Sequence, residues 1–371
     1  MAEPADDSGW SVVAVAYPGK VKHMMIPPWL LQEWPVGTSR SVASYMETCL
    51  WHQHHGYYNR NAVLGRYGDF ITSPEISQLF GEVLAIWAIS QWHSLEKPNP
   101  CQLIELGPGR ASLMLDMLRT FRIAPDFQAA LDIWLVEKSP TLTREQQVRL
   151  QGSCQAHWVQ ALDDVPQGAA IVIANEFFDA LPVQQFVHHQ GAWHERIVLH
   201  EPYGVLCFAV GERIDGFDPL CDKPAADGDI LERCPQASRI AGQLGMRTTH
   251  HPGAGILVDY GYQEAGFGDT LQGVRDHGYH SVLGDAGSVD LSAHVHFGAL
   301  GDALTRAGAE LAGILDQGAF LLRFGLGLRA ARLMSGKTEA EQETIKQAMQ
   351  RLTASDQMGH LFKCLIYQTP S

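Results

Sequence analysis

Apolar residues recur along the first hundred positions with the spacing of amphipathic helices. The pattern predicts one helix over residues 41–55 and a second over residues 74–93, in which Ile76, Phe80 and Val83 share one face. Thr72-Ser73-Pro74-Glu75 comes just before the second helix and offers hydroxyl caps, a proline for the first turn and a glutamate three residues after Thr72. We therefore expect that helix to begin near Pro74 and to bury its apolar face.

Beyond Pro100 the pattern changes to short, continuously apolar runs that alternate with helical stretches. Such alternation is typical of a doubly wound, mostly parallel sheet with helices on its faces. The predicted elements are strands at 102–106, 133–136, 157–159, 170–174, 255–260, 311–315 and 361–367, and helices at 113–121, near 297–307, within 319–334 and at 339–352.

Between Val183 and Val210 the apolar residues alternate with a period of two, and turn signals separate the runs. This pattern predicts an antiparallel insertion on the main sheet. We therefore divide the chain into an N-terminal tail (1–36), a helical N-terminal lid (37–100), a core (101–182 and 253–371) and a β-rich insertion (183–252).

Composition and charge exclude several classes of protein. The chain has 371 residues, of which 46% are apolar and 18% charged, as in a globular protein of one large domain or two ordinary ones. With a net charge of −14, the chain lacks the excess of lysine and arginine that a nucleic-acid-binding protein needs. We therefore expect no nucleic-acid partner.

The sequence also bears on location and on metals. No apolar run approaches the roughly 18 residues of a spanning helix, so we expect no membrane span. The seven cysteines form no C-x-x-C pair, and the first residues show neither a secretory nor an arginine-rich transit signal, so we expect a cytoplasmic protein. The 17 histidines lack the spacing of metal ligands, and we expect no metal site.

The sharpest local signal is a glycine turn between the first predicted strand of the sheet and the helix that follows it. Gly107-Pro108-Gly109 lets the backbone approach a ligand, and Glu105 precedes the turn at the end of the strand. A dinucleotide site would need a third glycine where Ser112 stands, together with a basic partner for the pyrophosphate. The turn therefore favours S-adenosylmethionine (SAM), which has a sulfonium and no phosphate, although a plain strand-to-helix connection could carry the same glycines.

Other predicted strands also end in acids. Glu137 closes the second strand, where an acid can accept hydrogen bonds from ribose hydroxyls, and Glu176 and Asp259 close two later ones. Because the carboxyl ends of parallel strands meet at one edge, we expect these acids to surround one pocket. The alternatives are ordinary strand-end acids and, for Asp179, a helix cap.

Several blocks of the chain, in this order, resemble those of the MidA-like SAM-dependent methyltransferases. The resemblance covers roughly residues 39–367. Ala111 stands where the family usually continues the glycine turn with a further glycine. The blocks are Gly56-Tyr57-Tyr58, residues 68–78, residues 105–110, residues 175–182, Asp259-Tyr260-Gly261-Tyr262, residues 268–272, residues 290–295 and residues 358–363.

The resemblance implies a class I methyltransferase fold, SAM as the methyl donor and an arginine of a protein as the acceptor. Mitochondrial members of that family are protein arginine methyltransferases needed for assembly of respiratory complex I, which implies a complex I subunit as the partner. Two other functions stay open: a SAM-binding assembly factor whose catalysis is dispensable, and a methyltransferase of small molecules.

From these motifs we assign three sets of site residues. An arginine acceptor stays cationic, so carboxylates must hold its guanidinium group, and Glu176 and Asp179 are the candidate catalytic residues. The candidate cofactor-binding residues are Thr72, Glu105, Gly107, Pro108, Gly109, Glu137 and Asn175, and the candidate acceptor-binding residues are Tyr58, Phe70, Glu75, Asp259 and Tyr260.

Overall fold

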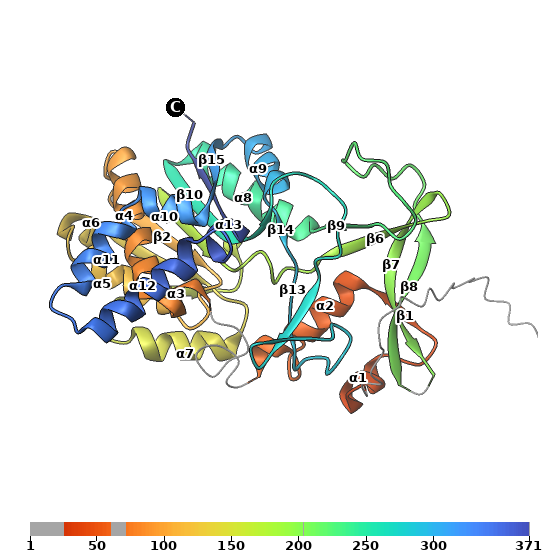
Figure 1. The fold of residues 1–371 in the computed structure, drawn as a ribbon. Coiled ribbons are helices and arrows are strands. Elements are labelled where there is room, and N and C mark those ends of the chain that lie inside the picture. Colours follow the sequence, from red (N-terminus) through yellow and green to blue (C-terminus); the bar gives the residue numbers. More distant parts are fainter. Residues whose placement is uncertain (1–25, 61–71, 203, 371) are drawn as a thin grey trace, which may run out of the picture.

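The computed structural model describes residues 26–60, 72–202 and 204–370, and its largest element is a mixed sheet (Figure 1). All neighbouring strands of this sheet are parallel except β16, which is antiparallel to β10 and β15. The mostly parallel sheet expected from the sequence is thereby confirmed. In spatial order its strands are β15 (Glu310–Asp316), β16 (Phe362–Gln368), β10 (Gly253–Tyr262), β5 (Ala170–Asn175), β2 (Cys101–Leu106), β3 (Leu131–Val136) and β4 (Ala156–Val159), with β14 (Val295–His296) paired to the end of β10.

The strand order reverses between β2 and β5. From β2 the chain runs outward through β3 to β4, and from β5 it continues on the other side through β10. In open parallel sheets, the crevice at the carboxyl ends of the strands beside such a reversal is where ligands bind. The topology therefore selects the ends of β2 and β5 as the place to look for a site.

Helices cover both faces of the main sheet because successive side chains in each strand point to opposite faces. Leu103 and Ile171 pack into one apolar cluster, whereas their neighbours Ile104 and Val172 pack into a second. On the first face lie α4 (Gln78–Ser94), α5 (Ser112–Phe121), α6 (Pro125–Ala130), α10 (Gln317–Arg323), α11 (Leu326–Met334) and α12 (Glu339–Thr353), and on the second lie η2 (Leu162–Asp164), α8 (Pro235–His250) and α9 (Phe297–Arg306). Shorter connections contain α3 (Ser73–Ile76), α7 (Pro140–Leu150) and α13 (Met358–Leu361).

A second lobe lies beside the main sheet, at the right of Figure 1. It contains a five-stranded antiparallel sheet and a three-stranded one, and a third apolar cluster joins its helices to its strands. Its strands are β1 (Ser39–Ser41), β6 (Gln184–His189), β7 (Ala192–Glu201), β8 (Val205–Arg213), β9 (Ile230–Arg233), β11 (Gln272–Arg275), β12 (Gly278–His280) and β13 (Asp290–Ser292), and its helices are α1 (Pro28–Glu33), α2 (Val42–Trp51) and η1 (Tyr57–Asn59).

The packing moves three of the expected domain boundaries. Leu30 in α1 is fully buried, so the tail expected over residues 1–36 is too long, and its residues 1–25 lie outside the described part of the chain. Helix α4 was assigned to the lid and α8 to the insertion, yet both pack on the main sheet. The apolar face of the helix predicted over residues 74–93 is buried as expected, but amphipathic spacing does not say which sheet a helix will cover. No helix was predicted over residues 235–250.

The predicted helix over residues 74–93 is interrupted at Ser77. The backbone of Ser77 is extended (φ −161°, ψ 138°), and its hydroxyl accepts a hydrogen bond from the Leu79 amide at 3.2 Å. Ser77 therefore ends α3 and caps α4, as a serine at an N-cap does. Within the described residues, no helix is both long enough and apolar enough to cross a bilayer.

Two glycines of α8 make a matched pair that tests the contact between α8 and α9. A Cβ at Gly245 would lie 2.7 Å from the Leu304 carbonyl oxygen, whereas one at Gly242 would meet nothing within 4 Å. We expect Gly245→Ala to lower the free energy of unfolding by about 1–3 kcal/mol, because the helices must move apart. Gly242→Ala should raise it by about 0.5–1 kcal/mol, because alanine favours the helix.

Urea denaturation of both variants checks this expectation. Equal effects of the two substitutions would contradict the close approach of α8 to α9.

Candidate active site

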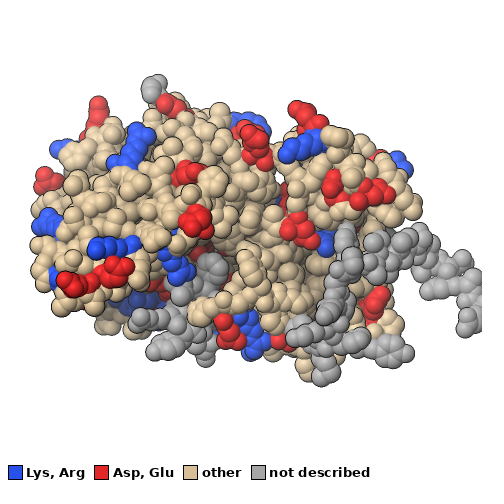
Figure 2. Space-filling model, viewed as in Figure 1, with Lys and Arg blue, Asp and Glu red and all other residues tan. Residues whose placement is uncertain are grey.

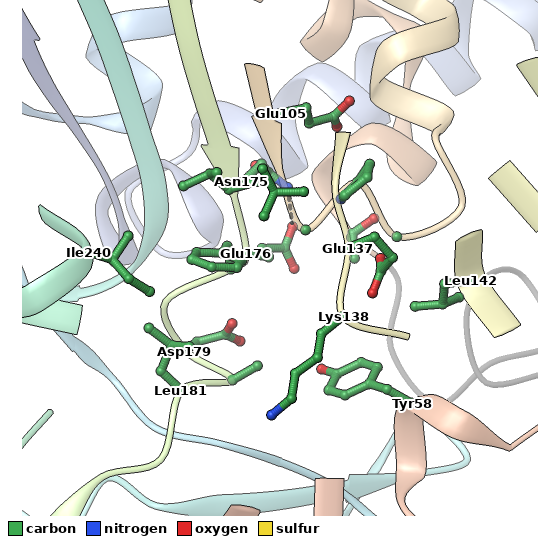
Figure 3. Close-up of a pocket in the computed structure, with 18 of the residues that line it drawn as sticks. Tyr58, Glu105, Glu137, Lys138, Leu142, Asn175, Glu176, Asp179, Leu181 and Ile240 are labelled. Carbon is green, nitrogen blue, oxygen red and sulfur yellow. Dashed lines mark hydrogen bonds between the residues drawn. The ribbon is translucent and has the colours of Figure 1, made fainter. Parts of the chain in front are cut away.

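A cavity of about 220 Å³ opens where β2, β3 and β5 end (Figure 3). It lies beside the reversal of strand order, as the topology requires. The predicted site residues that line it are Tyr58, Thr72, Glu75, Glu105, Gly107, Pro108, Gly109, Glu137, Asn175, Glu176, Asp179 and Tyr260. Phe70 lies outside the described residues.

The glycine turn between β2 and α5 depends on positive φ angles. Gly107 has φ +61° and Gly109 has φ +52°, and a Cβ on Gly107 would lie 2.8 Å from the Phe177 ring. Ala111 also has φ +59°, a left-handed conformation that costs an alanine roughly 1–2 kcal/mol. The backbone at Ala111 thus keeps the left-handed conformation that favours glycine, although the residue has a Cβ.

Glu105 is buried at the end of β2, with 3% of its surface exposed. Its Oε2 atom is buried and has no hydrogen-bond partner among the described residues. Burial, with the carboxylate of Glu137 as a second cause, raises the pKa of Glu105 to about 8. A buried oxygen that lacks a donor beside a cavity is suited to accept one from a ligand.

Glu137 ends β3 inside a small hydrogen-bond network. Its Oε1 accepts from the Ser139 amide at 2.8 Å, and its Oε2 accepts from Nε2 of Gln146 at 3.0 Å. The same Nε2 donates to the Gly109 carbonyl oxygen at 2.8 Å, and Gln146 Oε1 accepts from Nε1 of Trp158 at 3.0 Å. Burial raises the pKa of Glu137 to about 7, although these donors act in the opposite direction. Gln146 therefore ties the acid to the glycine turn.

Ser139 connects this network to the second lobe. Its hydroxyl donates to the Tyr58 carbonyl oxygen at 2.7 Å and accepts from the Leu142 amide at 3.2 Å, which caps α7. The Tyr58 ring lines the cavity from the side opposite the main sheet, and its hydroxyl donates to Oδ1 of Asp290 at 3.3 Å. The buried Ser139 thus connects Glu137, at the end of β3, to the backbone of Tyr58.

Glu176 follows β5 with a left-handed backbone, φ +49°, which is uncommon for a glutamate. Its Oε1 accepts from the Ser73 amide at 2.8 Å and from Nδ2 of Asn175 at 3.2 Å. Burial, with the neighbouring carboxyl of Asp179 as a smaller cause, raises the pKa of Glu176 to about 8. Backbone strain and a shifted pKa at one residue in a cavity are typical of functional sites.

Asp179 and Asp259 differ in role, and the prediction for Asp259 needs correction. Asp179 lines the cavity, its Oδ2 accepts from the Tyr260 hydroxyl at 2.7 Å, and burial raises its pKa. Asp259 is fully buried and is not part of the lining; it accepts from the amides of Phe178, Asp179 and Tyr260. Asp259 therefore fixes the loop after β5, whereas the strand-end pattern suggested contact with the acceptor.

Sequence reasoning missed several residues that line the cavity. Leu162 and Asp163 follow β4 at the same sheet edge, so the rule that found Glu105 and Glu137 could have found them too. Lys138 follows Glu137 directly, donates to Glu47 at 2.6 Å and lies 4.9 Å from the Trp51 ring centre. Arg239 and Gln243 come from α8, and no motif marks them.

Comparison with known proteins identifies relatives across most of the chain. Residues 83–315 match the model of a family of S-adenosyl-L-methionine-dependent methyltransferases. The chain is 35% identical to protein arginine methyltransferase NDUFAF7, mitochondrial, of Xenopus laevis, over 87% of this chain and 79% of the relative. It is 34% identical to the Homo sapiens protein of that name, over 87% and 78%.

A solved structure has the same fold. The crystal structure of a Burkholderia thailandensis protein bound to S-adenosyl-homocysteine superposes with a TM-score of 0.78 and 24% identity, over 90% of this chain and 89% of that one. These matches confirm the class I methyltransferase fold, the family resemblance and SAM as the cofactor.

The expected cytoplasmic location is wrong, because the curated relatives are named as mitochondrial proteins. That expectation rested on the absence of a targeting signal and of paired cysteines, and neither absence identifies a compartment.

The buried carboxyl of Glu105 should make the ligand-free protein lose stability as pH rises. Because its pKa is higher in the folded chain (about 8) than its ordinary 4.5, its contribution is complete below about pH 4.5 and is lost as pH rises through 8. The glutamine of Glu105→Gln stays neutral at every pH. The free energy of unfolding of this variant minus that of the parent should therefore increase with pH, by up to about 1.4 kcal/mol per pH unit in this window.

Urea titrations of the two proteins between pH 5 and pH 8.5 measure this difference, with the exposed Glu264→Gln as the control. Parallel pH profiles for Glu105→Gln and the parent would refute the raised pKa.

Proposed function

We propose that this chain, which belongs to the family of S-adenosyl-L-methionine-dependent methyltransferases, transfers the methyl group of that cofactor to arginine side chains of a protein. The observation that carries the proposal is the pair Glu176 and Asp179, two carboxyl groups that line the same cavity as the glycine turn. Relatives that cover most of this chain are named protein arginine methyltransferases, which supports the choice of acceptor.

The cofactor half of the cavity fits SAM chemically. SAM has two positive centres, an ammonium and a sulfonium, and two ribose hydroxyls. The Oε2 atom of Glu105 lacks a partner among the described residues, and we assign it to accept a hydrogen bond from a donor group of the cofactor. We assign Glu137 to accept hydrogen bonds from the ribose hydroxyls. Gly107 and Gly109 leave room for the methionine part, with Thr72, Pro108 and Asn175 beside them.

The acceptor half would hold a guanidinium between carboxylates. When bound, the cofactor supplies a methyl group that is attached to a sulfonium. The methyl group passes to the acceptor by in-line displacement, and the sulfur is left as a neutral thioether. Glu176 and Asp179 would bind the planar guanidinium through paired hydrogen bonds and stabilise the charge that arrives on it. Tyr58, Glu75 and Tyr260 complete this side of the cavity in our assignment.

Methylation of a guanidinium nitrogen leaves one proton to remove. Glu176 has a pKa raised to about 8 by burial, which suits it to take up that proton. Its Oε1 already accepts two hydrogen bonds, from the Ser73 amide and from Asn175, and these keep the side chain in place. We assign proton acceptance to Glu176 and orientation of the guanidinium to Asp179, which the Tyr260 hydroxyl holds.

For the acceptor protein, the sequence resemblance implies a subunit of respiratory complex I, and we propose such a subunit as the partner. The arginine is favoured over lysine because a compact ammonium cannot make the two-pronged contact with a carboxylate pair and must lose its proton before it attacks.

Labelled SAM tests the proposal. The pure protein, incubated with methyl-labelled SAM and a mitochondrial extract, should place label on arginine in a discrete protein band. Label in small molecules alone would support a small-molecule methyltransferase. No transfer by a protein that binds SAM would support an assembly factor with dispensable catalysis, and either result would refute the arginine activity.

Conservative changes of the two carboxyls should separate turnover from cofactor binding. We expect Glu176→Gln and Asp179→Asn each to lower turnover by about 100-fold or more, because each removes a charged contact made to the acceptor. The SAM dissociation constant, measured by calorimetry, should stay within about threefold of the parent, as it should for Glu264→Gln. Loss of SAM affinity with normal turnover at saturation would reverse the assigned roles.

A further inference from the structure

A second cavity, of about 570 Å³, lies directly beside the first. Glu75, Arg110 and Ser112 line both cavities, so the two adjoin at the start of α5. The far side of the second cavity is formed by α12, which contributes Arg351, and by Arg149 at the end of α7. We call this second cavity the arginine groove.

The groove concentrates positive charge in an acidic protein. The chain has a net charge of −14, yet Arg110, Arg149 and Arg351 all line this one cavity. In Figure 2, Lys and Arg side chains appear beside acidic ones at the lower left, the part of the molecule that carries α7 and α12. Three guanidinium groups around one groove favour an anionic occupant.

Only part of this charge is compensated within the described residues. Arg110 donates through Nε to Oε1 of Glu145 at 2.6 Å. Arg149 donates to the Ser112 hydroxyl at 3.4 Å, and neither Arg149 nor Arg351 has a carboxylate within ion-pair distance in the part of the chain that the structure describes. Arg149 and Arg351 therefore have guanidinium donors left for an acceptor that the described residues do not supply.

Glu75 marks the boundary between the two cavities. Its Oε2 is buried without a hydrogen-bond partner among the described residues, and burial raises its pKa while Arg110 and Arg149 lower it. The two adjoining cavities thus differ in lining: Glu176 and Asp179 line only the first, and Arg149 and Arg351 line only the second. A ligand that occupies both cavities would need a cation in the first and an anion in the second.

We propose that the arginine groove binds acidic side chains of the acceptor protein, on the same segment as the arginine that is methylated. This inference rests on the proposed function, because it takes the acceptor arginine to occupy the first cavity. A polypeptide with an arginine and, a few residues away, glutamates or aspartates has the required order of charges. Guanidinium groups bind such carboxylates in a bidentate manner, which gives direction as well as affinity.

Synthetic peptides of about 14 residues test the proposal. Each contains one arginine and a pair of glutamates on a Gly/Ser background, with the spacing between them increased from one peptide to the next. Twins with glutamine in place of glutamate are the reference. Their dissociation constants are measured with the full chain, loaded with S-adenosyl-homocysteine, by fluorescence anisotropy at low and at high salt.

At one or more spacings, the glutamate peptide should bind at least about fivefold more tightly than its glutamine twin, and salt should reduce the difference. The double variant Arg149→Gln/Arg351→Gln should abolish the preference. The double variant Arg306→Gln/Arg332→Gln removes two exposed arginines, likewise from the last turns of helices but outside the groove, and should retain it.

Equal binding of the twins, no binding of any glutamate peptide, or a preference that survives Arg149→Gln/Arg351→Gln would overturn the assignment of the groove. Methyl transfer from labelled SAM to the same peptides separates the two proposals. A glutamate preference in binding without any methylated arginine refutes the proposed function and leaves the groove as a site for acidic peptides. A methylated arginine without a glutamate preference in binding refutes the groove alone.

Discussion

Keeping carboxyl groups away from water, close to one another, is the constraint on which the site depends. Glu105, Glu137, Glu176 and Asp179 come from three strand ends and share one cavity. Burial opposes their ionisation, and each raised pKa records that cost. The protein reduces the cost with backbone N–H donors, such as the Ser73 amide for Glu176 and the Ser139 amide for Glu137. Part of the cost of ionisation remains, and a cationic ligand that binds the carboxylates can offset it.

The rest of the fold supplies the rigidity that such a site needs. The strands that carry the acids lie in the middle of a sheet buried on both faces, so their ends cannot shift independently. Asp259, fully buried and bonded to three backbone amides, fixes the loop that carries Asp179. Left-handed backbone at Ala111 and Glu176 is strained, and it persists because the packed surroundings determine it.

The sequence predicted the parts of this structure that depend on local pattern. Continuous apolar runs identified the buried strands, and the glycine turn after Glu105 identified the ligand edge of the sheet. Which sheet a helix covers depends on packing between distant segments, so the division into a lid and an insertion did not foresee that α4 and α8 pack on the main sheet. For the same reason Arg239 and Gln243 were missed, since a helix residue near a distant strand end leaves no local signal. Asp259 shows the converse limit, because a strand-end acid can serve the backbone as well as a ligand.

The position of Ser139 has a consequence for the order of events at the site. Its amide holds Glu137, on the cofactor side, and its hydroxyl holds the carbonyl of Tyr58, on the acceptor side. These two bonds are the route by which a ligand at Glu137 would act on Tyr58. By thermodynamic linkage the effect must be equal in both directions: whatever free energy the donor contributes to acceptor affinity, the acceptor returns to donor affinity. In our assignment, the two halves of the site are thus joined by a residue that touches neither substrate.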